Sequence, residues 1–190
     1  MVDETKDSRR AKAVPAGGLP APAQAVLYGL APVAGAQTAM MILGSFPGGV
    51  SLARGQYYAH PQNQFWKILA AVWPQHPQPP AGDYAERCLW LLERRLGLWD
   101  VYASCEREGS LDSRIRNARV NDFAALAQQC PGLVAIAHNG GESFRHARHT
   151  AALGVPVLRL PSTSPANAAI SFERKLAAWH EAFAAHGLTG

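Results

Sequence analysis

Short apolar runs that end in glycine, proline or polar residues limit most strongly what this chain can fold into. Residues 39–43 (AMMIL) form one such run, followed by a stretch rich in glycine and proline, and residues 133–137 (LVAIA) form another. Uninterrupted apolar runs of this length are typical of strands buried on both faces of a sheet. Residues 155–160 predict a further strand, and residues 98–103 (LWDVYA) alternate as a strand does.

Segments with apolar residues at helical spacing separate and follow these strands. The predicted helices cover residues 63–72, 84–96, 121–130, a segment from about Gly141, and 167–186. This alternation predicts an α/β protein, a single-domain three-layer α/β/α fold with a short, mainly parallel four-stranded sheet. Ligands of such sheets bind beyond the carboxyl ends of the strands. The loops that start at Gly44, near Ala103, at His138 and at Pro161 are therefore expected to converge on one cleft.

The first 24 residues differ in composition from the rest of the chain. They are mostly charged residues, alanine, proline and glycine, which predicts a disordered tail at residues 1–24 before one domain at residues 25–190. No stretch resembles a secretory signal or a membrane span. We therefore expect a soluble, cytoplasmic protein without membrane contacts.

Cysteine spacing and net charge exclude few functions. Cys88, Cys105 and Cys130 lack CxxC spacing, so the sequence predicts neither a disulfide framework nor a metal site. The formal net charge of +4 is compatible with a polyanionic partner but does not identify one. The motifs must supply the function.

Two motifs about a hundred residues apart carry a family resemblance. The first is the loop GSFPG at residues 44–48, followed by QYYAHPQNQFW at residues 56–66; the second is LPSTSPAN at residues 160–167. This combination resembles the uracil DNA glycosylase superfamily, over roughly residues 25–188. Together with the string LWDV and the following ASCEREGSLD, it is most similar to the hypoxanthine-DNA glycosylase branch.

The resemblance implies an enzyme that repairs DNA. Its substrate would be DNA with a deaminated base, most of all hypoxanthine, which is flipped from the duplex and cut from its sugar by hydrolysis. It implies a monofunctional glycosylase of base-excision repair, a monomer without a cofactor or metal. No lysine lies inside either motif to form a Schiff base.

The catalytic residue implied by the resemblance is Asn63. Phe46 stands where most relatives carry the Asp or Asn that orients water, and a phenyl ring cannot polarise water. The Asn63 amide oxygen can accept a hydrogen bond from an attacking water. The alternative is that Asn63 caps the predicted helix at residues 63–72, and the two roles are compatible.

Several residues are predicted to hold the flipped base. Backbone N–H groups of Gly44, Ser45 and Phe46 can donate to its carbonyl oxygens. The resemblance places Tyr58 as an aromatic platform, with core packing as the alternative. It also places Asp100 at the base edge, where an ionised carboxylate would accept from N1–H of hypoxanthine and spare adenine; a loop cap is the alternative.

Two further elements are predicted to contact the substrate. Asn139 follows a strand and could hold the base or a phosphate, although the sequence NGG also suits a tight turn. The polar side chains of the second motif are predicted to contact DNA phosphates, and the last of them could instead cap the final helix. They are Ser162, Thr163, Ser164 and Asn167.

Two other functions stay open. The first is removal of uracil, as in the mismatch-specific branch. The second is a catalytically weak protein that binds DNA damage, which is suggested by Phe46 and by Leu160, where the superfamily has a histidine.

Overall fold

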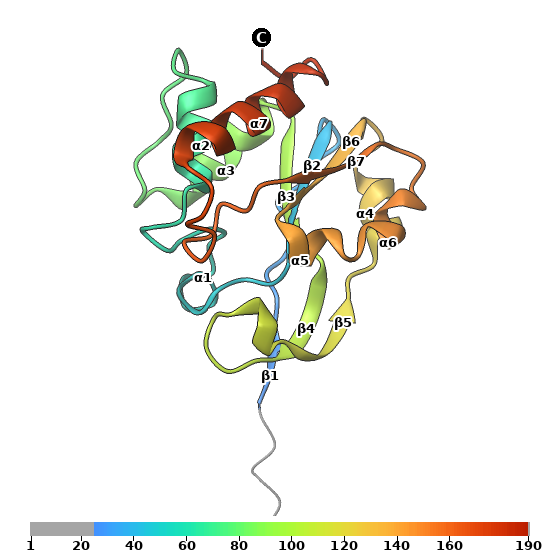
Figure 1. Ribbon diagram of the computed structural model, residues 1–190. Coiled ribbons are helices and arrows are strands. Elements are labelled where there is room, and N and C mark those ends of the chain that lie inside the picture. Colours follow the sequence, from blue (N-terminus) through green and yellow to red (C-terminus); the bar gives the residue numbers. More distant parts are fainter. Residues whose placement is uncertain (1–24, 190) are drawn as a thin grey trace, which may run out of the picture.

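A parallel four-stranded sheet forms the centre of the computed structural model, which describes residues 25–189 (Figure 1). Its strands run in the order β3-β2-β6-β7. They are β2 (Met40–Gly44), β3 (Leu96–Asp100), β6 (Ala135–Asn139) and β7 (Val157–Leu160). All three pairings are parallel, so the predicted sheet is confirmed. The predicted disordered tail, residues 1–24, lies outside the described residues.

Helices cover both faces of this sheet (Figure 1). One layer contains α2 (Phe65–Val72), α3 (Tyr84–Glu93) and α7 (Phe172–Ala184). The other contains α4 (Phe123–Gln129), α5 (Gly141–Phe144) and α6 (Ala147–Ala151). The predicted three-layer α/β/α fold is therefore confirmed. Within residues 25–189, no helix combines the length and the hydropathy needed to cross a membrane.

Strand β2 lies between two hydrophobic cores. Met40 and Ile42 face the layer of α2, α3 and α7, while Met41 and Leu43 face the layer of α4. Every residue of β2 is buried. Burying one large apolar side chain stabilises a fold by roughly 1.5–3 kcal/mol. An all-apolar strand therefore anchors the glycine-rich loop that follows it.

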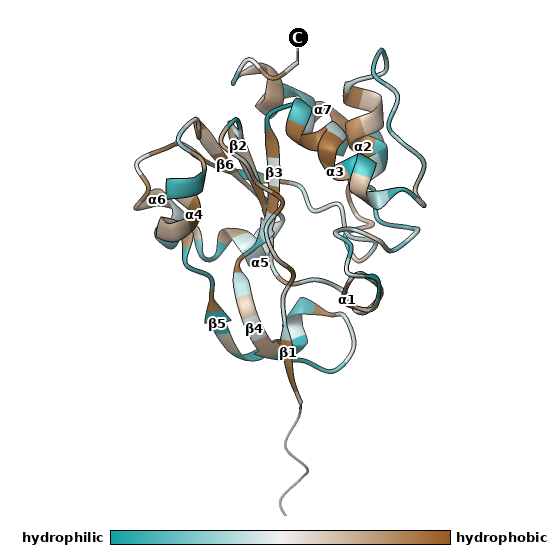
Figure 2. Cartoon of the chain, turned by 180° about the vertical axis from the view of Figure 1, so that it is seen from behind, coloured by the Kyte–Doolittle hydropathy of each residue, from teal (hydrophilic) through white to brown (hydrophobic). Residues whose placement is uncertain are grey.

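A second, antiparallel sheet lies beyond the carboxyl ends of the main strands and was not predicted. It consists of β1 (Val26–Tyr28), β4 (Tyr102–Glu106) and β5 (Arg116–Val120), in the order β1-β4-β5. In Figure 2, β3 has mostly hydrophobic colours, whereas β5 carries a hydrophilic band. Because most of β5 is exposed, its sequence lacks the apolar run that reveals a buried strand.

The predicted strand at residues 98–103 is wrong as one element. The chain leaves the main sheet at Val101, whose N–H donates to Gly44 O, and continues as β4 in the second sheet. Between them, β3 and β4 carry the alternating pattern that the sequence shows as one run.

Three helix boundaries also differ from the predictions. Helix α3 ends at Glu93, because Arg95 adopts a φ of 58° and β3 begins at Leu96. Helix α4 begins at Phe123 and not at residue 121, because Asp122 caps it: its carboxylate accepts from Ala125 N. The cap of α7 is Ser171, so Asn167 does not cap it.

Gly97 lies inside β3 and does not end a helix. A Cβ at this position would come within 2.6 Å of Met41 Cε. A larger residue here would therefore force the Met41 and Thr38 side chains to move.

Candidate active site

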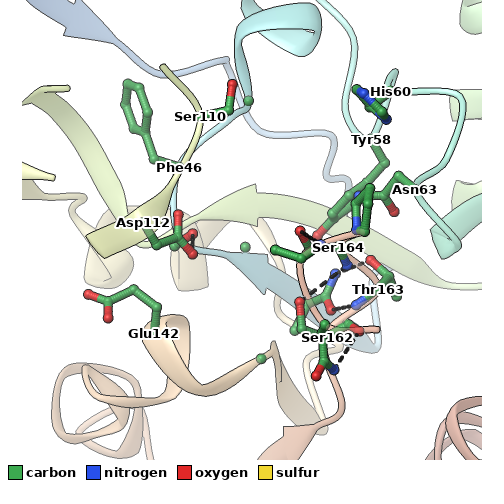
Figure 3. A pocket seen from close by; sticks show the side chains of 18 of the residues that line it. Phe46, Tyr58, His60, Asn63, Ser110, Asp112, Glu142, Ser162, Thr163 and Ser164 are labelled. Carbon is green, nitrogen blue, oxygen red and sulfur yellow. Dashed lines mark hydrogen bonds between the residues drawn. The ribbon is translucent and has the colours of Figure 1, made fainter. Parts of the chain in front are cut away.

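A cavity of about 820 Å³ opens at the carboxyl ends of the parallel strands (Figure 3). The predicted convergence of the strand-end loops is confirmed, although the last residue of β3, Asp100, and residues 110–113 line the cavity in place of Ala103. Each predicted site residue lines this one cavity. They are Gly44, Ser45, Phe46, Tyr58, Asn63, Asp100, Asn139, Ser162, Thr163, Ser164 and Asn167.

Tyr58 presents an aromatic surface to the cavity. Its ring stacks on Phe65, with centroids 4.0 Å apart and 25° between the ring planes. Phe65 is fully buried and covers one face of Tyr58, whereas Tyr58 itself is partly exposed. The opposite face of the ring is therefore available to a ligand.

The Tyr58 backbone and hydroxyl are both unusual. The residue adopts a φ of 55°, which residues other than glycine rarely adopt. Its hydroxyl is buried and has no hydrogen-bond partner among the described residues. Burial, and then the charge of Asp100, raise the pKa of Tyr58, so the phenol stays protonated. Strain and an unpaired polar atom at one residue are typical of a functional position.

Asn63 begins the turn into α2. Its Oδ1 accepts a hydrogen bond from N of Phe65 (3.0 Å), the first residue of α2, but the N-cap of this helix is Gln64 and not Asn63. An amide oxygen has two lone pairs, and one of them stays available for a second donor. Asn63 lies beside Tyr58 on the same side of the cavity (Figure 3).

Asp100 lies deep in the site, paired in register with Gly44 of the neighbouring strand. It is only 4% exposed, and Oδ2 has no partner among the described residues. A Cβ on Gly44 would lie 2.3 Å from Asp100 Oδ1, so the carboxyl can occupy this place only beside a glycine.

The protonation state of Asp100 differs from the prediction. Burial, and then the charge of Asp112, raise the pKa of Asp100 to about 8, against the opposing charge of Arg107. The carboxyl is mostly neutral near pH 7, so it has an O–H donor as well as an acceptor. The expectation of a purely accepting carboxylate is wrong for the free protein.

Asn139 and Thr163 join the end of β6 to the loop after β7. Thr163 N donates to Asn139 Oδ1, and Asn139 Nδ2 donates to Thr163 Oγ1; each hydrogen bond is 2.9 Å long. Thr163 is fully buried, so its side chain cannot make the predicted contact with DNA. It positions the loop instead.

The rest of the second motif is held by short-range hydrogen bonds. Ser162 Oγ accepts from Ser164 N (3.2 Å), and Asn167 Nδ2 donates to Ser162 O (3.0 Å). Gly140, with a φ of 105°, lets the loop approach, because a Cβ there would lie 2.8 Å from Ser162 Cβ. Ser162 and Ser164 stay partly exposed at the cavity.

Comparison with known proteins places this site in a family. The family model described as Uracil DNA glycosylase superfamily matches residues 31–183. The chain belongs to the uracil DNA glycosylase superfamily. A hypoxanthine DNA glycosylase of Methanosarcina barkeri is 36% identical over 155 residues, 82% of this chain and 96% of that protein. One of Methanosarcina acetivorans is 35% identical over 146 residues, 77% of this chain and 90% of that protein.

A solved structure shows the same fold. The solution NMR structure of a candidate uracil DNA glycosylase from Methanosarcina acetivorans has a TM-score of 0.73 and 31% sequence identity. The match covers 86% of this chain and 99% of that one. The whole superfamily domain of the neighbour is therefore present here.

Phe46 departs from the pattern that the first motif has in most of the superfamily. The residue is 6% exposed and belongs to the hydrophobic core cluster that includes Met41 and Tyr102. The Arg107 guanidinium lies 5.0 Å from the ring centroid. Figure 3 shows the phenyl ring on the far side of the cavity from Asn63. A side-chain role at the base is therefore unsupported, and only the Phe46 backbone can serve there.

A segment between β4 and β5, residues 107–114, completes the cavity and was not predicted as part of the site. Ser110, Asp112 and Ser113 line the cavity. The string ASCEREGSLD, residues 103–112, contains Ser110 and Asp112 and contributed to the family resemblance, but no local pattern assigned its side chains a role. A contact between residues that are distant in sequence is invisible to such patterns.

A buried lysine links the two motifs of this superfamily member. Lys175 of α7 is 1% exposed and donates from Nζ to Gln64 Oε1 and Asn167 O, both at 2.8 Å. Burial lowers the pKa of Lys175. The sequence shows this residue only as one charge on an amphipathic helix.

The cavity side chains do not form a metal centre. Among residues 25–189, no three His, Cys, Asp or Glu side chains come close enough to hold a metal ion. His60, which also lines the cavity, accepts a hydrogen bond from Gln62 N through Nδ1 (3.2 Å).

Proposed function

We propose that this protein is a DNA glycosylase of base-excision repair that removes hypoxanthine from DNA. The supporting observation is the convergence of Tyr58, Asn63 and Asp100 on one cavity at the strand ends. The similarity to two hypoxanthine DNA glycosylases over most of both chains favours this base. The protein would act as a monomer on flipped nucleotides inside the cell.

The flipped base would stack on the free face of Tyr58. Stacking of a base on an aromatic ring contributes about 1–3 kcal/mol. Backbone N–H groups of the loop at Gly44, Ser45 and Phe46 would then donate to the base as negative charge develops on it. Phe65 supports the platform, because its ring backs that of Tyr58.

Asp100 would read the edge of the base. A neutral carboxyl can donate to O6 and accept from N1–H of hypoxanthine at the same time. With its proton on the other oxygen, it could also pair with N1 and N6–H of adenine. The neutral form therefore does not spare adenine by itself, and only the ionised form rejects the bare N1.

Asn63 would orient the attacking water through the second lone pair of Oδ1. The C1′–N9 bond breaks and its electron pair leaves with the purine, while the water oxygen bonds to C1′. The water releases one proton to solvent, and the purine anion takes up one proton. Ser162 and Ser164 would hold the flanking phosphates.

A panel of oligonucleotides tests this function. Single- and double-stranded substrates with hypoxanthine, uracil, xanthine or normal bases are incubated with excess protein, and abasic sites are counted after alkaline cleavage. We expect excision of hypoxanthine to be fastest and normal adenine to be spared. Faster release of uracil would assign the protein to uracil removal, which the solved neighbour favours. Binding without any abasic site would show a damage-binding protein.

Replacing Tyr58 with Leu tests the platform. We expect the enzyme concentration for half-maximal excision to rise about tenfold, because roughly 1–3 kcal/mol of stacking is lost. Tyr58→Phe is the matched control, since it keeps the ring and removes a hydroxyl that has no described partner. Equal half-maximal concentrations for the Leu variant and the wild type would refute the platform.

A further inference from the structure

Residues 107–114, here called the β4–β5 segment, are tied to the first motif by side-chain hydrogen bonds. Gly49 N donates to Ser110 Oγ (2.9 Å), and Ser45 Oγ donates to Asp112 Oδ2 (2.8 Å). In a third hydrogen bond, the Arg107 guanidinium donates to Pro47 O, a backbone carbonyl of the loop at residues 44–48. The segment and the loop therefore form one wall of the cavity.

Asp112 lines the cavity with a carboxylate that could interact with a substrate. It is partly buried, and among the described residues it forms no ion pair. By contrast, Glu142 accepts from Tyr102 OH (2.9 Å) and pairs with Arg145 (3.2 Å). Burial raises the pKa of Asp112 above its ordinary value, although the hydrogen bond from Ser45 and the charge of Arg107 oppose this rise, and the charge of Glu142 adds to it.

Asp112 is held next to the position where the first motif lacks an acidic or amide side chain. Ser45, which holds Asp112, directly precedes Phe46, where most of the superfamily carries Asp or Asn. Figure 3 shows Asp112 on one side of the cavity and Tyr58 with Asn63 on the other. A nucleotide inserted between the two sides would meet the aromatic platform on one side and a carboxylate on the other.

We propose that Asp112 is a catalytic residue whose carboxylate faces the sugar of the flipped nucleotide and stabilises the positive charge that forms there. It supplies from the β4–β5 segment the polar group that Phe46 leaves out of the first motif. The role is electrostatic, because Asp112 forms no bond to the sugar and transfers no proton. This inference rests on the proposed glycosylase function.

Charge removal without a change of shape tests the role. Asp112→Asn keeps an acceptor for Ser45 Oγ, and we expect its single-turnover rate on hypoxanthine DNA to fall roughly 10²–10³-fold at saturating enzyme. Ser45→Ala, which frees the carboxylate from its hydrogen bond, should lose less. Asp122→Asn is the matched control, because Asn still caps α4 through Ala125 N, and its rate should stay unchanged.

A binding measurement separates charge stabilisation from structural support. Duplexes carry either a cationic pyrrolidine in place of the sugar or a neutral tetrahydrofuran. We expect the wild type to prefer the cationic duplex, and Asp112→Asn to lose about tenfold of this preference while it still binds the neutral duplex. Ser45→Ala should lose part of the preference, which keeps the test open if Asp112→Asn does not fold.

The outcomes distinguish this inference from the proposed function. If the wild type excises hypoxanthine and Asp112→Asn keeps both its rate and its preference for the cation, the Asp112 role is refuted and the glycosylase stands. If the wild type excises no base of the panel, the proposed function fails, and the Asp112 role fails with it.

Discussion

Asp100→Asn should become more stable relative to the wild type as the pH rises. We expect the difference in unfolding free energy, variant minus wild type, to be a few kcal/mol larger at pH 9 than at pH 4. Burial raises the pKa of Asp100 from 3.8 to about 8 in the folded state. Well below pH 3.8 the carboxyl is protonated in both states, so its titration does not change the stability there. Between pH 4 and 8 the unfolded chain loses a proton that the folded protein keeps. Wild-type stability therefore falls by up to about 1.4 kcal/mol per pH unit.

Urea denaturation of both proteins from pH 4 to pH 9 measures this difference. The Asn side chain does not titrate, so the gap in unfolding free energy should widen up to about pH 8 and then stay constant. Parallel stability curves would mean that Asp100 is not held neutral by burial. In that case the two-bond pairing with hypoxanthine O6 and N1–H would lose its basis.

Asn63→Ala should lower the single-turnover excision rate by roughly 10²-fold, because a positioned hydrogen-bonding group contributes on that order. The substitution also removes the bond to Phe65 N, which should cost about 1 kcal/mol of stability. Asn63→Ser separates the two effects. A serine hydroxyl can still accept from Phe65 N in the turn before α2, but it is too short to reach the same water.

Rates and melting temperatures of the two variants decide between a structural role and catalysis. We expect both variants to lose activity and only the Ala variant to lose stability. A Ser variant with the wild-type rate would show that Asn63 serves the helix alone. Full activity of the Ala variant would also rule out the catalytic role.

The first motif shows how far local patterns reach. The apolar run at residues 39–43 predicted β2, because a strand buried on both faces needs no polar residues. The glycines after it predicted a loop at the ligand edge of the sheet, and Gly44 indeed makes room for Asp100. The second sheet escaped prediction, because β5 is mostly exposed and two strands of different sheets share one alternating run.

Thr163 and Asp112 show where local patterns fail. Thr163 has the polar side chain and the motif position of a DNA contact, yet Asn139, 24 residues away, binds it in the interior. Asp112 begins a short 3₁₀ helix that no sequence pattern marked, yet it accepts a hydrogen bond from Ser45, 67 residues away in the chain. Neither partner can be found from the residues nearby.

Motifs and periodicity in the chain were enough to predict the family, the layered α/β architecture and eleven of the residues that line the cavity. Those features depend on hydrophobic spacing and on short strings that act within one turn or strand. Folding of distant segments against one another decided which of those residues stay exposed, that Asp100 is neutral and that Asp112 joins the site. Desolvation and charge proximity depend on distances in space, and those distances exist only once the chain has packed.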